Sequence, residues 1–368
     1  MRIHILTPCF VPGDAVSHDV LGMCRWLRRH GHETHIYAGR CPRGLRRKFR
    51  RLDRYRSYLH NSDDIALYHQ SVGWPEGLEL FEVSRHPKVV KYHNVTPPEY
   101  FKPYNPLYVR VCQNGMRDTR RLIKAAPDLW LTDSDFNADE LVKHGVDPAD
   151  CQTVPPFHAI HRLEQIGHDD ELAETLSRQS NLLFIGRVAP NKGHFHLLRA
   201  FAYYRNMLLG QSLLHIIGGH DFGLTSYRDA LLLEARRLGV ADLVHFAGKV
   251  SSGRLKTYFA HASVFVCASE HEGFCVPLVE AMYYGVPIVA YGSSAVAHTL
   301  GESSLSWETP SPSLLAESIL EIESRPEVRA TLIQSQREHF DANFSEDAIA
   351  RRFDDAMSPL LNGVLGHA

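Results

Sequence analysis

The sequence predicts an α/β protein with two Rossmann-like, doubly wound parallel-sheet domains and a cleft between them. Short apolar segments alternate with amphipathic ones almost from end to end, and the alternation restarts after a polar stretch near 157–180. A chain of 368 residues is also long enough for two hydrophobic cores. Short apolar strands that alternate with helices form parallel sheets covered on both faces. In such sheets ligands bind beyond the carboxyl ends of the strands, so the residues that follow each strand are the ones to inspect.

The first half of the chain contains six apolar runs that predict strands. They lie at 2–6, 34–38, 65–68, 89–92, 128–132 and 153–154. Helices are expected at 16–29 and at about 136–144. The first of these has an apolar face that runs from Val16 to Leu27 at helical spacing, and Gly31 is positioned to end it.

The second half repeats the pattern and sets the domain boundaries. Strands are expected at 182–185, 213–217, 243–246, 263–267 and 287–290, and helices at 193–207, 226–238, 254–260 and 277–284. After Pro310 the chain is expected to be mainly helical. The predicted domains are therefore 1–165 and 166–340, with a final helix in 341–368 that packs back on the N-terminal domain.

Composition excludes several classes of protein. A hydrophobic fraction of 44%, a charged fraction of 22% and a formal net charge of −2 are typical of a globular protein that does not bind nucleic acid. No apolar run reaches the roughly 18 residues that span a bilayer, and the chain opens on a strand-like run, so neither a membrane span nor a signal peptide is expected. The seven cysteines are scattered without a CxxC pair, which indicates reduced thiols in the cytoplasm. The close histidine pairs, His158 with His161 and His194 with His196, lack further ligands, and no metal site is expected.

Two strand–helix turns carry residues suited to an anion. Gly13 follows the first strand and lets the backbone approach a ligand ahead of a helix N-terminus, although no GxGxxG pattern is present. The second domain opens with a strand that ends at Gly186, and Arg187 and Lys192 follow it at the mouth of a helix. Two cations beside a helix N-terminus form a seat for a diphosphate. The spacing alone is equally compatible with solvated surface residues.

The most informative segment places two glutamates around a loop and the start of a helix. It reads Glu-Gly-Phe-x-x-Pro-x-x-Glu-Ala at 272–281, and Gly-x-Pro-x-Val-Ala follows at 285–290. Glu272 lies in the loop and Glu280 lies one to two turns inside the helix. Gly273 frees the backbone between them, and a carboxylate accepts paired hydrogen bonds from a vicinal diol such as a ribose.

This segment resembles family 4 of the retaining glycosyltransferases, which have the GT-B fold. Further similarity lies in Arg187, Lys192 and Gly13, and in the segments 68–73 and 91–101, which resemble acceptor-domain motifs of bacterial surface-polysaccharide members, many of them mannosyltransferases. The resemblance implies catalytic roles for His93, Arg187, Lys192 and Glu272. It implies donor binding by Gly13, Gly186, Val250, Gly273, Phe274, Cys275, Val276 and Glu280, and acceptor-side roles for Asp14, His18, Asn94 and Thr96. Gly13 is followed by Asp14 where family members often have a second glycine, and we expect this carboxylate to point at the acceptor.

The implied function is the transfer of a hexose, with mannose favoured, from a GDP- or UDP-linked sugar to a saccharide or lipid-linked acceptor. No matched residue is an obvious nucleophile backed by a base, which favours a same-face substitution in which Arg187 and Lys192 stabilise the leaving diphosphate. No cofactor or metal is then required. Asp133-Ser-Asp135 spells a DxD pattern, but N-capping of the following helix is the favoured interpretation. A GT-B epimerase or phosphorylase and a non-catalytic sugar-nucleotide binding protein remain as alternatives.

A basic run at 40–56 contains nine of the 40 Lys and Arg residues. Leu45, Phe49 and Leu52 recur among them at helical spacing, which predicts a basic amphipathic helix. Such a helix suits an anionic membrane surface and a cytoplasmic protein peripheral to the inner face of the cell membrane. A solvated helix or mobile loop is the alternative.

Overall fold

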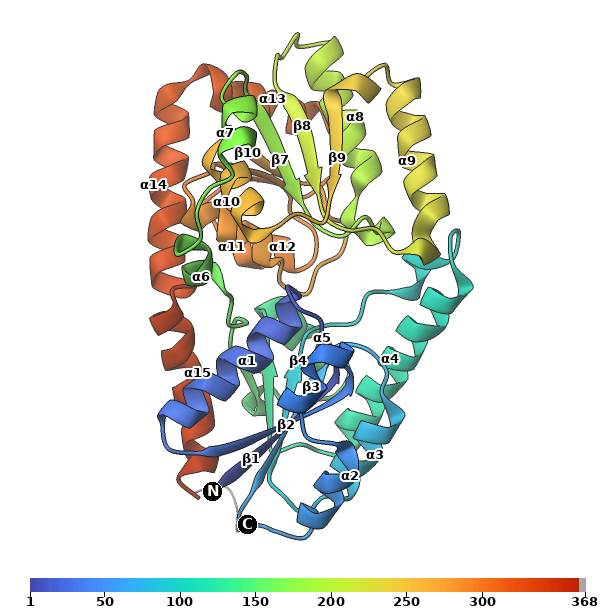
Figure 1. Ribbon diagram of the computed structural model, residues 1–368, viewed down its shortest axis with the longest axis vertical. Helices are drawn as coiled ribbons and strands as arrows, with labels where there is room; N and C mark the ends of the chain where they lie inside the picture. Colours follow the sequence, from blue (N-terminus) through green and yellow to red (C-terminus); the bar gives the residue numbers. More distant parts are fainter. Residues whose placement is uncertain (364–368) are drawn as a thin grey trace. The chain divides into compact units, whose positions relative to one another are not determined.

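The computed structural model describes residues 1–363 and divides into two compact units (Figure 1). Unit 1 comprises Met1–Glu99, Pro106–His158 and the residues from Phe344 onward, and unit 2 comprises Tyr100–Asn105 and Ala159–Asn343. The sequence placed these boundaries after 165 and after 340, and it gave no sign that 100–105 belongs with unit 2. The last five residues of the predicted C-terminal segment, 364–368, lie outside the described residues.

Unit 1 contains one six-stranded sheet in which every strand pair is parallel, with the order β2-β1-β3-β4-β5-β6. The strands are β1 Arg2–Cys9, β2 Glu33–Arg40, β3 Ile65–Gln70, β4 Lys88–Tyr92, β5 Leu129–Thr132 and β6 Cys151–Thr153. The strand order reverses between β1 and β3, which therefore mark the topological switch point of this sheet. All six residues of β3 are buried, including the polar His69 and Gln70.

Helices cover both faces of this sheet (Figure 1). They are α1 Ala15–Arg29, α2 Leu52–Tyr55, α3 Pro75–Val83, α4 Pro106–Lys124, α5 Asp135–Lys143 and α15 Glu346–Leu361. The apolar face of α15 carries Ile349, Phe353 and Met357, which join the core cluster that contains Val20 and Met23 of α1. The last helix thereby belongs to unit 1 although it follows unit 2 in the chain.

Unit 2 contains a second all-parallel sheet with the order β12-β11-β10-β7-β8-β9. Its strands are β7 Asn181–Ile185, β8 Leu213–Ile217, β9 Val244–Gly248, β10 Val264–Cys267, β11 Ile288–Tyr291 and β12 Leu305–Trp307. Its helices are α6 Ile160–Glu164, α7 Asp170–Leu176, α8 His194–Asn206, α9 Thr225–Arg237, α10 Ser252–Ala260, α11 Val276–Tyr283, α12 Ala295–Leu300, α13 Pro312–Ser324 and α14 Pro326–Asn343. The switch point lies between β7 and β10. Across residues 1–363, no helix is both long enough and apolar enough to cross a membrane.

The remaining helical turns are short 3-10 segments. They are η1 Arg43–Lys48, η2 Arg56–Tyr58, η3 Pro98–Phe101, η4 Pro148–Asp150, η5 Pro190–Lys192, η6 Phe222–Leu224 and η7 Ala241–Leu243.

The single basic helix expected at 40–56 is wrong. The segment forms η1 and the one-turn α2, with an extended stretch between them. There the amide of Arg50 donates to the carbonyl of Ile36 at 2.8 Å, and Arg50 forms a parallel bridge with Tyr37 of the edge strand β2. An extended residue in this bridge interrupts the helix. The nine basic side chains of the segment are all exposed.

Gly193 allows the backbone before α8 to pass close to Ala268, the residue that follows β10. Its φ is +64°, and a Cβ at this position would lie 1.8 Å from the carbonyl oxygen of Ala268. Gly193→Ala combines a left-handed backbone with a clash against backbone atoms, so we expect a loss of clearly more than about 1 kcal/mol in chemical denaturation.

Gly239→Ala is the matched control, because Gly239 has a φ of +73° in the same unit with nothing within 4 Å of the added Cβ. The control isolates the backbone strain from the clash. Equal losses in the two variants would contradict the close approach.

Candidate functional site

The carboxyl ends of β7 and β10 meet at the switch point of unit 2. After β7, the amide of Gly186 donates to the carbonyl of Ile217 at 2.9 Å, and the exposed Arg187 comes next. Within residues 1–363 the guanidinium of Arg187 makes no hydrogen bond or ion pair with another side chain or the backbone. An exposed cation at this edge is available to an anionic ligand.

Lys192 and Glu272 form the central ion pair of this edge. The Lys192 Nζ lies 2.5 Å from Glu272 Oε1, which also accepts a hydrogen bond from the Ser269 hydroxyl at 2.8 Å. Burial alone would lower the pKa of Lys192, but the charge of Glu272 outweighs this and raises it, while nearby Arg187 opposes the rise. The ammonium therefore stays charged, and two cations lie near each other at the end of β7.

The loop that carries Glu272 is fixed by backbone contacts from both sides. The carbonyl of Asn191 accepts the amides of Glu270 and His271 at 2.9 and 3.1 Å, and its side-chain amide donates to the His271 carbonyl at 3.0 Å. On the other side, the amide of Glu272 donates to the Ser294 hydroxyl at 2.8 Å. Ser294 has a φ of +45°, a strained conformation for a residue with a Cβ. The loop that carries Glu272 is thus held in one conformation.

Glu280 lies in the second turn of α11, which begins directly after this loop. Cys275 ends the loop with a φ of +77°, and Pro277 occupies the first turn of the helix. Within residues 1–363 the carboxylate of Glu280 makes no hydrogen bond or ion pair, and burial raises its pKa to about 7. An acceptor without a protein partner at this position suits a ligand with paired hydroxyls.

The other donor residues expected from sequence also lie in unit 2, with the exception of Gly13. Val250 follows β9 and is half-buried. Gly273 and Val276 are half-buried. Phe274 and Cys275, which follow Glu272 closely in the chain, are buried. Gly13 belongs to unit 1, in the exposed loop after β1, where its φ is +83°.

Asp14 caps the first helix of unit 1. Its Oδ2 accepts the amide of Ser17 at 3.3 Å and the Ser17 hydroxyl at 3.4 Å, so the carboxylate turns toward the start of α1. His18 is half-buried in the same turn, and Thr96 is half-buried after β4. Asn94 is buried with a φ of +70°, and its amide donates to Glu140 Oε2 at 2.7 Å.

His93 directly follows β4 and lies inside a buried polar cluster. Its Nδ1 lies 2.8 Å from Asp133 Oδ2, and its Nε2 lies 2.8 Å from His69 Nδ1. Asp133 also pairs with the buried Lys91 at 2.6 Å. Burial opposes ionisation of Asp133, yet His93 and Lys91 hold its pKa below the ordinary value.

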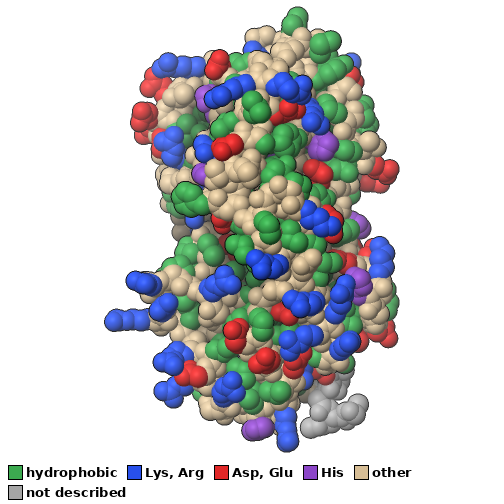
Figure 2. Space-filling model, turned by 90° about the vertical axis from the view of Figure 1, so that its right-hand side faces the viewer, with side chains coloured by type: hydrophobic (Ala, Val, Ile, Leu, Met, Phe, Trp, Pro, Cys, Tyr) green, Lys and Arg blue, Asp and Glu red, His purple; other side chains and the backbone are tan. Residues whose placement is uncertain are grey.

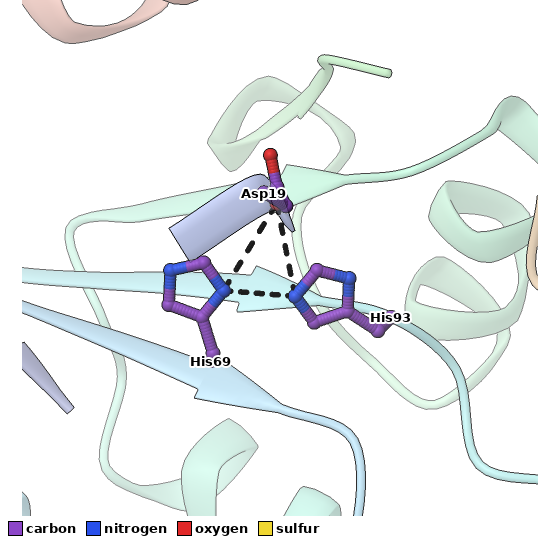
Figure 3. A group of neighbouring side chains, drawn as sticks. All are labelled: Asp19, His69 and His93. Carbon is purple, nitrogen blue, oxygen red and sulfur yellow. Dashed lines mark hydrogen bonds and ion pairs between the residues drawn. The ribbon is translucent and has the colours of Figure 1, made fainter. Parts of the chain in front are cut away.

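Asp19 approaches the two imidazoles from α1 (Figure 3). Its Oδ1 accepts the amide of Phe157 at 2.8 Å, whereas its Oδ2 is buried without a hydrogen-bond partner. Burial raises the pKa of Asp19 to about 6 and lowers that of His69 well below its usual value. The cluster thus combines two carboxylates, two imidazoles and one ammonium away from water.

The structure corrects the interpretation of Asp133-Ser-Asp135. Ser134, rather than an aspartate, caps α5 and accepts the amide of Asn137 at 3.4 Å. Asp133 points into the cluster, and Asp135 accepts the Thr153 hydroxyl at 2.6 Å.

Sequence reasoning missed four residues of this cluster. They are Asp19, His69, Lys91 and Asp133, which lie on three strand ends and one helix. The available signal was that His69 and Lys91 are polar residues inside strands that are otherwise buried, because buried polar groups need partners.

Residues 169–339, which contain the paired cations and both glutamates, match the family model described as "Glycosyl transferases group 1". The matched residues lie within unit 2.

Known proteins resemble the chain both in sequence and in fold. A D-inositol 3-phosphate glycosyltransferase of Streptomyces avermitilis is 29% identical over 228 residues, which cover 59% of this chain and 49% of that protein. The match therefore spans about half the length of this relative. HepE of Anabaena, solved with UDP-glucose, superposes with a TM-score of 0.74 at 17% identity over 97% of this chain and 99% of its own. Sucrose-phosphate synthase of Thermosynechococcus elongatus superposes with a TM-score of 0.75 at 17% identity, over 98% of this chain and 99% of its own. The fold is that of GT-B glycosyltransferases, as the sequence predicted.

Proposed function

We propose that the protein is a retaining glycosyltransferase that binds a nucleoside diphosphate hexose at the carboxyl edge of the unit 2 sheet. The observation that carries the proposal is the carboxylate of Glu280, half-buried in the second turn of α11 without a protein partner and following the Lys192–Glu272 pair in the chain. A ribose diol supplies the hydrogen bonds that this carboxylate lacks. The match to the group 1 family model and the solved complex of HepE with UDP-glucose support the same ligand class.

Arg187 and Lys192 are proposed to hold the diphosphate. A diphosphate offers Lys192 a second anion, so it competes with Glu272 for the ammonium and frees this carboxylate for a sugar hydroxyl. During transfer, negative charge grows on the leaving diphosphate, and two preorganised cations stabilise it without a rearrangement of solvent. We propose that this step needs no metal and proceeds by same-face substitution with retention.

The proposed hexose and acceptor rest on the resemblance of two segments of unit 1 to acceptor-domain motifs. Mannose is the hexose that the segments 68–73 and 91–101 favour, while HepE was solved with UDP-glucose. The acceptor is proposed to be a saccharide or a lipid-linked saccharide of a surface glycan. The proposed sugar-side contact is His93, which follows β4. The proposed acceptor-side contacts are Asp14, His18, Asn94 and Thr96.

Nucleotide binding is the first test of this function. We expect UDP or GDP, but neither ADP nor NAD, to raise the thermal unfolding midpoint, because a ligand at about 100 times its Kd adds about 2.7 kcal/mol. Glu280→Ala should abolish this shift, whereas Glu317→Ala, an exposed glutamate of α13 in the same unit, should retain it. UDP-glucose and GDP-mannose are then offered with saccharide acceptors. Stabilisation by NAD alone would overturn the proposal.

Nucleotide affinity is also expected to depend on pH. Because the pKa of Glu280 is about 7, the carboxylate is mostly ionised at pH 8 and mostly protonated at pH 6. If the ionised form is the acceptor for the ribose hydroxyls, the Kd of UDP or GDP rises by up to about tenfold from pH 8 to pH 6. Isothermal titration at the two pH values measures this ratio. Glu280→Gln should bind with a flatter profile, and an unchanged profile in this variant would assign the effect to other groups.

We further propose that the protein is cytoplasmic and that the segment 40–56 of unit 1 contacts an anionic membrane surface. Its nine basic residues are exposed, and the acidic residue among them is Asp53. Lys and Arg side chains are numerous on the face of unit 1 drawn in the lower half of Figure 2. Each cation near an anionic surface contributes on the order of 1 kcal/mol.

Vesicle binding tests this surface. The chain should sediment with phosphatidylserine-containing vesicles at low salt and be released at high salt, since screening shortens the reach of surface charge. Charge reversal at Arg46, Arg47, Arg50 and Arg51 should abolish binding. The control reverses four exposed cations of α4 in the same unit, namely Arg110, Arg117, Arg120 and Lys124. Equal loss in both variants would show that net charge, rather than this segment, governs binding.

A further inference from the structure

Three potential metal ligands converge near the switch point of unit 1. Asp19 comes from α1, which follows β1, while His69 lies in β3 and His93 directly follows β4 (Figure 3). The two facing imidazole nitrogens, Nδ1 of His69 and Nε2 of His93, are 2.8 Å apart. The Oδ2 atom of Asp19 lies 4.0 Å from the first and 3.8 Å from the second.

The spacing of the three donor atoms allows one metal ion to contact all of them. A circle through three points 2.8, 3.8 and 4.0 Å apart has a radius of about 2.1 Å, so one point lies at that distance from all three atoms. Zinc binds imidazole nitrogen at about 2.0–2.1 Å and carboxylate oxygen at about 2.0–2.2 Å. Two imidazoles and one carboxylate are a donor set that suits zinc and other late first-row ions.

A second set of contacts orients two of the three ligands, His93 and Asp19. His93 turns Nδ1 toward Asp133 at 2.8 Å, which leaves Nε2 facing the cluster, and Lys91 in turn holds Asp133 at 2.6 Å. Asp19 is fixed through its other oxygen by the Phe157 amide. An imidazole that donates one nitrogen to a carboxylate while the other faces a shared point is the arrangement found around bound metal ions.

The protein alone leaves this cluster unsatisfied. A proton shared between His69 and His93 accounts for their short contact, but Asp19 Oδ2 remains buried without a hydrogen bond. Such an oxygen carries a desolvation cost that a cation would remove. We propose that Asp19, His69 and His93 bind a divalent transition-metal ion of the zinc class, which replaces the shared proton and uses the free Asp19 oxygen.

All three ligands of this site belong to unit 1, whereas the residues that match the group 1 family model belong to unit 2. The site shares one residue with the proposed sugar transfer, because His93 is also a proposed sugar-side contact. An ion on Nε2 occupies the ring nitrogen of His93 that would otherwise be offered to a sugar. Three protein ligands also leave at least one coordination position for water or another oxygen ligand.

Metal content and metal titration test the site directly. The untagged full-length chain, purified without chelators, should contain about one transition-metal ion per chain by elemental analysis, or bind one after addition of Zn²⁺. After stripping, titration with Co²⁺ should give visible absorption bands that Zn²⁺ abolishes. Asp19→Asn should weaken Zn²⁺ binding by more than about 100-fold. Asp133→Asn, which keeps all three ligands but removes the charge that orients His93 and pairs with Lys91, should weaken it by about 10- to 100-fold.

Asp118→Asn is the matched control, because Asp118 is a buried aspartate of unit 1 that accepts the Trp74 amide at 2.8 Å away from the cluster. It should bind Zn²⁺ as the unmodified chain does. Circular dichroism and the nucleotide shift of unit 2 verify folding, and Asp133→Asn serves as the second variant should Asp19→Asn fail to fold. A chain that contains no metal and binds neither Co²⁺ nor Zn²⁺ below roughly 100 μM overturns the proposal, as does wild-type affinity in Asp19→Asn.

Discussion

The reversal of strand order within each parallel sheet is the constraint on which both sites depend. At the reversal, the chain leaves neighbouring strands toward opposite faces of the sheet, so the loops at their carboxyl ends diverge and leave a crevice. In unit 2 this happens between β7 and β10, and Lys192 and Glu272 follow these two strands. In unit 1 it happens between β1 and β3, where α1 supplies Asp19 and β3 supplies His69. The topology alone therefore brings polar residues from distant parts of the chain to one edge.

Stability does not explain the charged residues found at these edges. A buried ion pair often gives no advantage over apolar side chains of the same size, because desolvation of the two charges offsets their attraction. Lys91 is fully buried in a strand where an apolar residue would pack without that cost, and its partner Asp133 is nearly as buried. Ser294 and Cys275, which lie beside the loop that carries Glu272, have strained backbone conformations. This strain also lowers the stability of the folded chain. We interpret charged residues held at such cost as a sign that each of these two edges binds a ligand.

The sequence predicted the repeating strands and helices because their apolar periodicity is local. It placed Glu272 in a loop and Glu280 in the helix that follows for the same reason, since the two elements are adjacent in the chain. Contacts between distant segments could not be predicted. His69 and His93 are separated by 24 positions and Asp19 by another 50, so no spacing pattern joins them. The helix expected at 40–56 failed for the same reason, since a bridge from Arg50 to the edge of β2 overrides its local periodicity.

The two switch points have opposite chemistry, and the reason lies in how each crossover helix begins. Free amides at a helix N-terminus favour anions, and unit 2 adds Arg187 and Lys192 to that preference, which suits a diphosphate. In unit 1 the start of α1 is already occupied, because the Asp14 carboxylate accepts the Ser17 amide and places a negative charge where an anion would bind. One turn further on, Asp19 adds a second carboxylate with an unpartnered oxygen. The same topology thus presents a cationic edge in one unit and an anionic, imidazole-rich one in the other, and the second suits a cation rather than a phosphate.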